Sequence, residues 1–134
     1  MRFMLLQNYG GVGLEGCPPM NEWTPEEVAA HIEFQHVLNQ ELTESGELVD
    51  AQGLAGPDQA KFVVSDGVGA PVITDGPYAE AKELLAGYRM VDVDTLERAL
   101  EIAARSSASP GPGGVALRQA IEVRQVMGAP EPEV

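Results

Sequence analysis

Apolar residues recur with two different periods along this chain, and the changes of period separate predicted strands from predicted helices. Residues 2–8 alternate closely enough for a buried first strand. The run Thr24-Pro25-Glu26-Glu27 then combines a capping threonine, a proline suited to the first helical position and a glutamate that closes a capping box. The helix that begins there should continue to about Ser45, because Gly46 can adopt the left-handed conformation that ends a helix.

Shorter apolar runs after this helix predict strands separated by turns, and one further helix. The strands are expected over residues 47–54, 60–65, 71–74, 87–93 and 120–126, with one or two helical turns over 78–85. Asp94-Thr95-Leu96-Glu97 repeats the pattern of a cap followed by a glutamate, so a second helix begins there. Its apolar stripe would consist of Leu96, Ala99, Leu100 and Ala103.

The order of these elements predicts a single α+β domain with a ferredoxin-like split βαβ arrangement and an added β-hairpin. The domain should comprise residues 1–127, because residues 128–134 form a tail with no reason to fold by itself. Two helices on one face of a mainly antiparallel sheet leave the other face without cover. A second copy of the sheet would cover it, which predicts a homodimer with a buried sheet-to-sheet interface.

Composition and charge argue against several classes of protein. The 134 residues carry a formal net charge of -13, and the eight lysines and arginines form no cluster, so no direct nucleic-acid partner is expected. The apolar run at the N-terminus is too short for a signal peptide or a membrane span, which predicts a cytoplasmic protein without a membrane anchor.

Metal and cofactor motifs are also lacking. The two histidines stand five residues apart without the spacing of a metal site, and the single cysteine, Cys17, has no partner ligand. The glycines of residues 10–13 lead into prolines and not into a helix, so a dinucleotide or phosphate loop is not supported. We therefore expect no metal and no cofactor.

The most specific motif is the stretch Val72-Ile73-Thr74-Asp75-Gly76-Pro77-Tyr78-Ala79-Glu80-Ala81-Lys82-Glu83, followed by Gly87-Tyr88. It resembles the signature of the YCII-related family, in its DGPF subgroup, with Tyr78 in place of the usual phenylalanine. The resemblance covers nearly the whole domain and implies a ferredoxin-like α+β fold and a dimeric α+β barrel.

What the resemblance implies about function divides into two. Some YCII-related members are dehydrochlorinase-like enzymes that use a His–Asp pair, whereas others sit beside extracytoplasmic-function sigma factors with no assigned chemistry. Asp75 matches the aspartate of that pair. Gln35 stands where the histidine lies on the first helix of such members, so the usual proton-transfer partner is absent from its expected position.

The residues themselves leave the role of this region open. A carboxylate at a strand end can act as a general base, but Asp75 can equally hold the Asp-Gly-Pro turn through backbone hydrogen bonds. At helical spacing the first helix has an apolar stripe of Val28, Ile32, Leu38 and Leu42. His31 and Gln35 lie on the same side, so both should point toward the sheet. His31 would then be either a substitute for the missing histidine or a buried side chain with a backbone partner.

The motif also offers residues that would bind a substrate. Lys82 is a candidate anion-binding cation at the mouth of a pocket, and Tyr78 and Glu83 would complete the binding set with Gln35. The alternative for Lys82 and Glu83 is a solvated short helix with local charge pairs, and for Tyr78 it is packing.

Two functions from different classes follow. The first is a small-molecule lyase or isomerase that abstracts a proton or eliminates a group with Asp75 and His31, without a metal. The second is a non-catalytic module that binds a small-molecule ligand or regulates sigma-factor-dependent transcription as the partner of a sigma factor. A stress-related dimer without a ligand is a third, less specific interpretation.

Overall fold

The computed structural model describes residues 1–9, 16–76 and 84–129, and the secondary structure below refers to these residues. The strands and helices are, in order, β1 (Arg2–Tyr9), α1 (Pro25–Glu44), β2 (Leu48–Gly53), β3 (Lys61–Val64), β4 (Val72–Asp75), β5 (Leu84–Asp92), α2 (Leu96–Ser107) and β6 (Ile121–Gln125). Three short 3-10 helices accompany them, namely η1 (Met20–Glu22), η2 (Pro57–Gln59) and η3 (Pro112–Gly114). The strand and helix order predicted from the sequence is confirmed.

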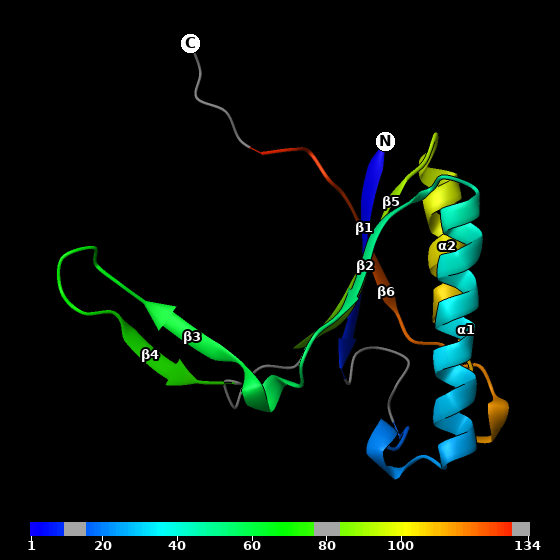
Figure 1. The fold of residues 1–134 in the computed structure, drawn as a ribbon, viewed down its shortest axis with the longest axis horizontal. Helices are drawn as coiled ribbons and strands as arrows, with labels where there is room; N and C mark the ends of the chain where they lie inside the picture. Colours follow the sequence, from blue (N-terminus) through cyan, green and yellow to red (C-terminus); the bar gives the residue numbers. More distant parts are fainter. Residues whose placement is uncertain (10–15, 77–83, 130–134) are drawn as a thin grey trace.

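Four strands form an antiparallel sheet in the order β2-β5-β1-β6. The two helices lie together on one face of this sheet (Figure 1). Because each helix connects strands that are not neighbours in the sheet, the arrangement is the split βαβ of a ferredoxin-like α+β fold. The predicted fold class is therefore confirmed. The homodimer stays a prediction.

The added hairpin is a separate two-stranded sheet made of β3 and β4. It leaves the end of β2 through η2 and extends away from the four-stranded sheet on the side opposite the helices (Figure 1). The antiparallel register pairs Val63 with Ile73 and Val64 with Val72.

The start of α1 has the capping geometry that the sequence predicted. The Thr24 hydroxyl accepts a hydrogen bond from the Glu27 amide at 3.2 Å, and the Glu27 carboxylate accepts one from the Thr24 amide at 2.9 Å. These two bonds satisfy amide groups that the first helical turn cannot pair internally. At the other end Gly46 has a φ of 79°, the left-handed conformation that favours glycine.

The core lies between the sheet and the C-terminal half of α1 together with α2. Its buried apolar residues are Phe3, Leu5, Leu38, Leu42, Val91, Val93, Ala99, Ile102 and Ala103. Half-buried Phe34, Leu48, Ile121 and Val123 pack around this cluster. The core therefore draws on both helices and all four strands of the sheet.

The structure corrects the apolar stripes expected for both helices. Ile32 of α1 is 58% exposed, whereas Leu38 and Leu42 further along the same helix are buried. On α2, Leu96 and Leu100 are exposed, and the buried face consists of Ala99, Ile102, Ala103 and Ser106. The buried residues of α2 still follow the helical period, but their face is rotated toward Ile102 relative to the predicted stripe. Two of the buried residues are alanines, whose small side chains let the helix approach the sheet.

The remaining local predictions have mixed outcomes. The prediction of helical turns over 78–85 is wrong for residues 84 and 85, because Leu84 and Leu85 belong to β5. There they pair with Tyr9 and Asn8 of β1. Residues 78–83 lie outside the described residues. The predicted tail over 128–134 also falls largely outside them, because the description ends at residue 129.

An ion pair between Arg98 and Glu47 joins α2 to the turn between α1 and β2. Arg98 contacts both carboxylate oxygens of Glu47, at 2.8 and 2.9 Å, and also bonds Glu101 at 3.0 Å. The bidentate bond from Arg98 lowers the pKa of the Glu47 carboxyl to about 2. Glu47 therefore stays ionised, and keeps this contact, at neutral pH.

Candidate functional site

Asp75, the aspartate of the sequence motif, is the last residue of β4. Its carboxylate forms an ion pair with Lys61 at the opposite position of β3, and its side chain is 79% exposed. The amide of Gly76 donates a hydrogen bond of 2.9 Å to Ala60, which continues the hairpin ladder by one residue beyond the paired strands. Asp75 thus lies at the base of the hairpin, where strand pairing holds both Asp75 and Lys61 in place.

Gln35 lies in a different environment, between α1 and the sheet. Its side-chain oxygen accepts a hydrogen bond from the guanidinium of Arg89 on β5. The prediction that Gln35 points toward the sheet is confirmed by this contact. Its amide nitrogen, Nε2, is buried and has no hydrogen-bond partner among the described residues.

Arg89 is the centre of a buried polar cluster that the sequence analysis did not identify. Only 5% of this residue is exposed, although its neighbours in the core are apolar. The guanidinium donates to Asn39 Oδ1 at 2.7 Å and to Ser106 Oγ at 3.1 Å, in addition to Gln35. Gln7 also reaches Ser106 Oγ, at 3.4 Å. The cluster therefore joins α1, α2, β1 and β5.

The electrostatics of this cluster are unusual because no carboxylate among the described residues bonds to the positive charge. Within the described residues, every partner of the Arg89 guanidinium is a neutral oxygen. Burial lowers the pKa of Arg89 to about 10, so the group remains charged at neutral pH. Buried charges are normally paired with an opposite charge, since hydrogen bonds to neutral groups replace only part of the lost hydration.

A signal in the sequence would have revealed Arg89. Gly87, Arg89, Val91 and Val93 alternate along β5 and the residues after it, and all four are buried toward the helices. A basic residue in the inward phase of a strand must be buried or must distort the strand. The period-2 pattern alone therefore places a cation in the core.

His31 makes contacts that differ from those of Gln35. Its Nδ1 lies 3.0 Å from the carbonyl oxygen of Pro110, which precedes η3, and the half-buried ring meets the edge of Trp23 with centroids 5.6 Å apart. Because a carbonyl oxygen only accepts hydrogen bonds, Nδ1 carries a proton in this contact, and in the neutral ring the lone pair then lies on Nε2. This is the backbone-partnered histidine of the two alternatives drawn from the sequence.

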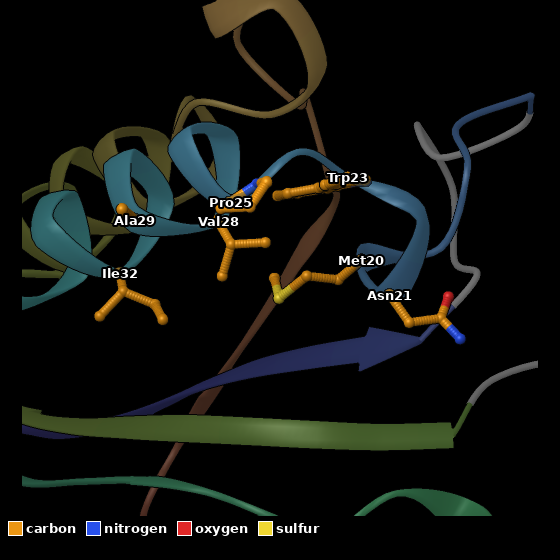
Figure 2. A pocket seen from close by; sticks show the side chains of 7 residues that line it. All are labelled: Met20, Asn21, Trp23, Pro25, Val28, Ala29 and Ile32. Atoms are coloured by element: carbon orange, nitrogen blue, oxygen red, sulfur yellow. The ribbon is translucent and has the colours of Figure 1, made fainter.

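An open apolar groove lies near His31, between η1 and the first turns of α1. Its lining consists of Met20, Asn21, Trp23, Pro25, Val28, Ala29 and Ile32. Met20, Val28 and Ile32 project from η1 and α1 toward the strands (Figure 2). The exposure of Ile32, unexpected for the inner side of a helix, is explained by this groove.

The residues proposed from the sequence thus lie in three separate sets of contacts. Asp75 is paired with Lys61 on the hairpin, Gln35 contacts Arg89 in the core, and His31 contacts Pro110. Tyr78, Lys82 and Glu83 lie outside the described residues. Within the described ranges no group of three histidine, cysteine, aspartate or glutamate side chains is placed to hold a metal ion. None of the helices in the described part of the chain is long and apolar enough to cross a membrane.

Comparison with known proteins agrees with the resemblance to the YCII-related family. The model of the YCII-related domain family matches residues 1–124. An uncharacterised protein from Rhizobium meliloti (strain 1021) is 30% identical over 97 residues, which cover 72% of this chain and 77% of that protein. The chain belongs to the YCII-related family. The family model thus covers nearly the whole domain, from β1 to the last strand, β6.

Proposed function

We propose that this chain is a non-catalytic module that binds a small molecule carrying an anionic, oxygen-rich group. One observation supports it above all: the buried guanidinium of Arg89 has only neutral oxygen partners among the described residues. The unpaired Nε2 of Gln35 adds a second buried donor to the same cluster. A carboxylate or similar group would accept from both donors and neutralise the buried charge.

The positions of the other polar residues favour binding over proton transfer. A general base must reach its substrate together with the group that takes up or returns the proton. Asp75 is instead paired with Lys61 on an exposed hairpin, whereas Gln35 is engaged in the core. The sigma-factor partner considered for such a module stays a prediction from the sequence.

Binding would be tested by thermal unfolding of the protein in the presence of acetate, pyruvate, benzoate and phosphate, with acetamide and benzamide as neutral counterparts. We expect one or more of the anions to raise the melting temperature and the amides to leave it unchanged. A ligand at a hundred times its dissociation constant stabilises the folded state by about 2.7 kcal/mol, which is a readily measured shift.

The matched variants for this test are Arg89→Met and Arg124→Met. Methionine is apolar and of similar length, and buried charged groups often tolerate such a replacement. Arg89→Met should abolish the response to anions, whereas Arg124→Met, at an exposed position of β6, should retain it. Equal responses in wild type and Arg89→Met, or no response to any anion, would contradict the proposal.

A lyase or isomerase is the second candidate, favoured by the state of His31. The bond from Nδ1 to Pro110 leaves Nε2 free to accept a proton, as a general base requires. We expect Asp75→Asn to lower any turnover of chlorinated acids or activated lactones by at least about a hundredfold, the lower end of general-base effects. Full retention of a turnover found in the wild type would dismiss Asp75 as the base.

A further inference from the structure

The hairpin β3–β4 exposes an unusual amount of apolar surface. Five aliphatic side chains on it are between 61% and 93% exposed, namely Val63, Val64, Val68, Val72 and Ile73. Soluble domains rarely leave such a contiguous apolar segment in water, and a segment of this kind marks a site of interaction. The hairpin is therefore a surface that needs a partner.

Both faces of the hairpin contribute to this surface. Alternation along the strands places the pair Val63–Ile73 on one face and the pair Val64–Val72 on the other. A two-stranded hairpin is at best marginally stable alone in water. Among the described residues, β3 and β4 form a sheet of their own, separate from the four-stranded sheet, and the aliphatic side chains on both faces are exposed.

The four-stranded sheet presents a second apolar surface on the same side of the molecule. Phe3, Leu5 and Val91 face the helices, so the alternate residues Met4, Leu6, Tyr88 and Met90 face the other way. The register places Met4 opposite Met90 and Leu6 opposite Tyr88, which forms one patch on the central strands. We call this patch the open face. The hairpin extends from the same side of the sheet, opposite the helices (Figure 1).

The rim of the open face is polar. On the edge strands, Asp50 and Gln52 of β2 and Glu122 and Arg124 of β6 stand beside the apolar patch. Tyr88 donates a hydrogen bond of 2.9 Å to Asp50, which joins the patch to its rim. An apolar centre surrounded by a polar rim is the usual composition of a protein–protein interface.

We propose that the hairpin β3–β4 is an arm that clasps a second copy of this chain seated on the open face. Each copy supplies one arm and one open face. In a two-fold dimer each arm therefore contacts the partner, and no arm or open face is left over to bind a third copy. The arm is nearly neutral, with Lys61 and Asp75 paired to each other, which suits apolar contact and not recognition of a charged macromolecule. The arm goes beyond the sheet-to-sheet dimer predicted from the sequence, because it adds a contact that the sheet alone does not make.

Net charge gives this assembly a definite dependence on salt. Each copy carries a formal charge of -13, so two copies repel each other at long range. Salt screens that repulsion over about 10 Å at 0.1 M and leaves apolar contact intact. The dissociation constant of the dimer should therefore fall as sodium chloride rises.

The arm would be tested by sedimentation equilibrium of the full chain over a range of concentrations and salt. The variants are Val63→Thr with Ile73→Thr, and Val64→Thr with Val72→Thr, because threonine keeps the strand propensity of valine while adding a hydroxyl. At least one pair should raise the dimer dissociation constant by about a hundredfold, roughly tenfold for each of the two arms. Val115→Thr, a change of the same kind at an exposed position after η3, is the control and should leave the constant unchanged.

Hydrogen exchange provides a readout that needs no variant. Amides of β3 and β4 should be protected at protein concentrations above the dissociation constant and exchange rapidly on dilution, since the hairpin alone is marginal. A monomeric wild-type protein, open-ended aggregates, or a dimer whose constant changes in neither variant pair would overturn the proposal. Hairpin protection that does not depend on protein concentration would overturn it as well.

Discussion

Leu42→Ala should lower the free energy of unfolding by about 3 kcal/mol. Leu42 is only 1% exposed and lies on the last turns of α1, where it packs in the core cluster. Alanine would remove the buried methyl groups and leave a cavity that two helices and a sheet can only partly close. Urea unfolding followed by circular dichroism would measure the change.

The control for this substitution is Leu100→Ala on α2. It removes the same atoms from a helix, but 48% of Leu100 is exposed, so the change should stay within about 1 kcal/mol. Similar losses at the two positions would contradict the assignment of the buried faces. That assignment matters because the sequence pattern favoured Leu100 as a core residue and the structure did not.

Ser106→Ala is expected to destabilise the protein by about 2 kcal/mol, although it removes a single oxygen. The Ser106 hydroxyl is buried, and it accepts hydrogen bonds from Arg89 at 3.1 Å and from Gln7 at 3.4 Å. Without it, one donor of a buried charged group loses its partner, and bonds to charged groups are the costly ones to lose. The measurement is again equilibrium unfolding in urea.

Ser107→Ala is the matched control, because it makes the same chemical change one position further along α2. Ser107 is half-exposed, so its replacement should change the free energy of unfolding by no more than about 0.5 kcal/mol. A loss at Ser106 no larger than at Ser107 would mean that the guanidinium of Arg89 does not depend on this hydroxyl. The guanidinium would then not be held by neutral hydrogen-bond partners in the way that the proposed anion site requires.

The sequence analysis placed Asp75 and Gln35 in one site, but the structure places them in different sets of contacts. Asp75 carries the family resemblance, yet it is exposed and paired with Lys61 at the base of the hairpin. Gln35, which the resemblance places at the position of the family histidine, has Arg89 as its partner. The proposed role in binding rests on Gln35 and Arg89, whereas a role in proton transfer would require Asp75.

The sequence by itself determined the features that depend on near neighbours. The capping box at Thr24 and Glu27, the left-handed Gly46 and the antiparallel hairpin all involve residues a few positions apart, so propensity and periodicity predict them. The sequence also predicted a strand over 87–93, and β5 covers most of that range. The alternation of buried and exposed positions along β5 also indicates that Arg89 is buried, because Arg89 lies in phase with Val91 and Val93.

Tertiary structure alone decided which polar groups meet and which apolar groups remain in water. Arg89 contacts residues 17, 50 and 54 positions away in the chain, and no local pattern specifies such pairs. Ile32 is exposed because it lines the open groove between η1 and α1. The valines of the hairpin are exposed because β3 and β4 pair only with each other. In each case the periodicity gives the direction of a side chain, but the arrangement of distant elements decides what, if anything, lies there.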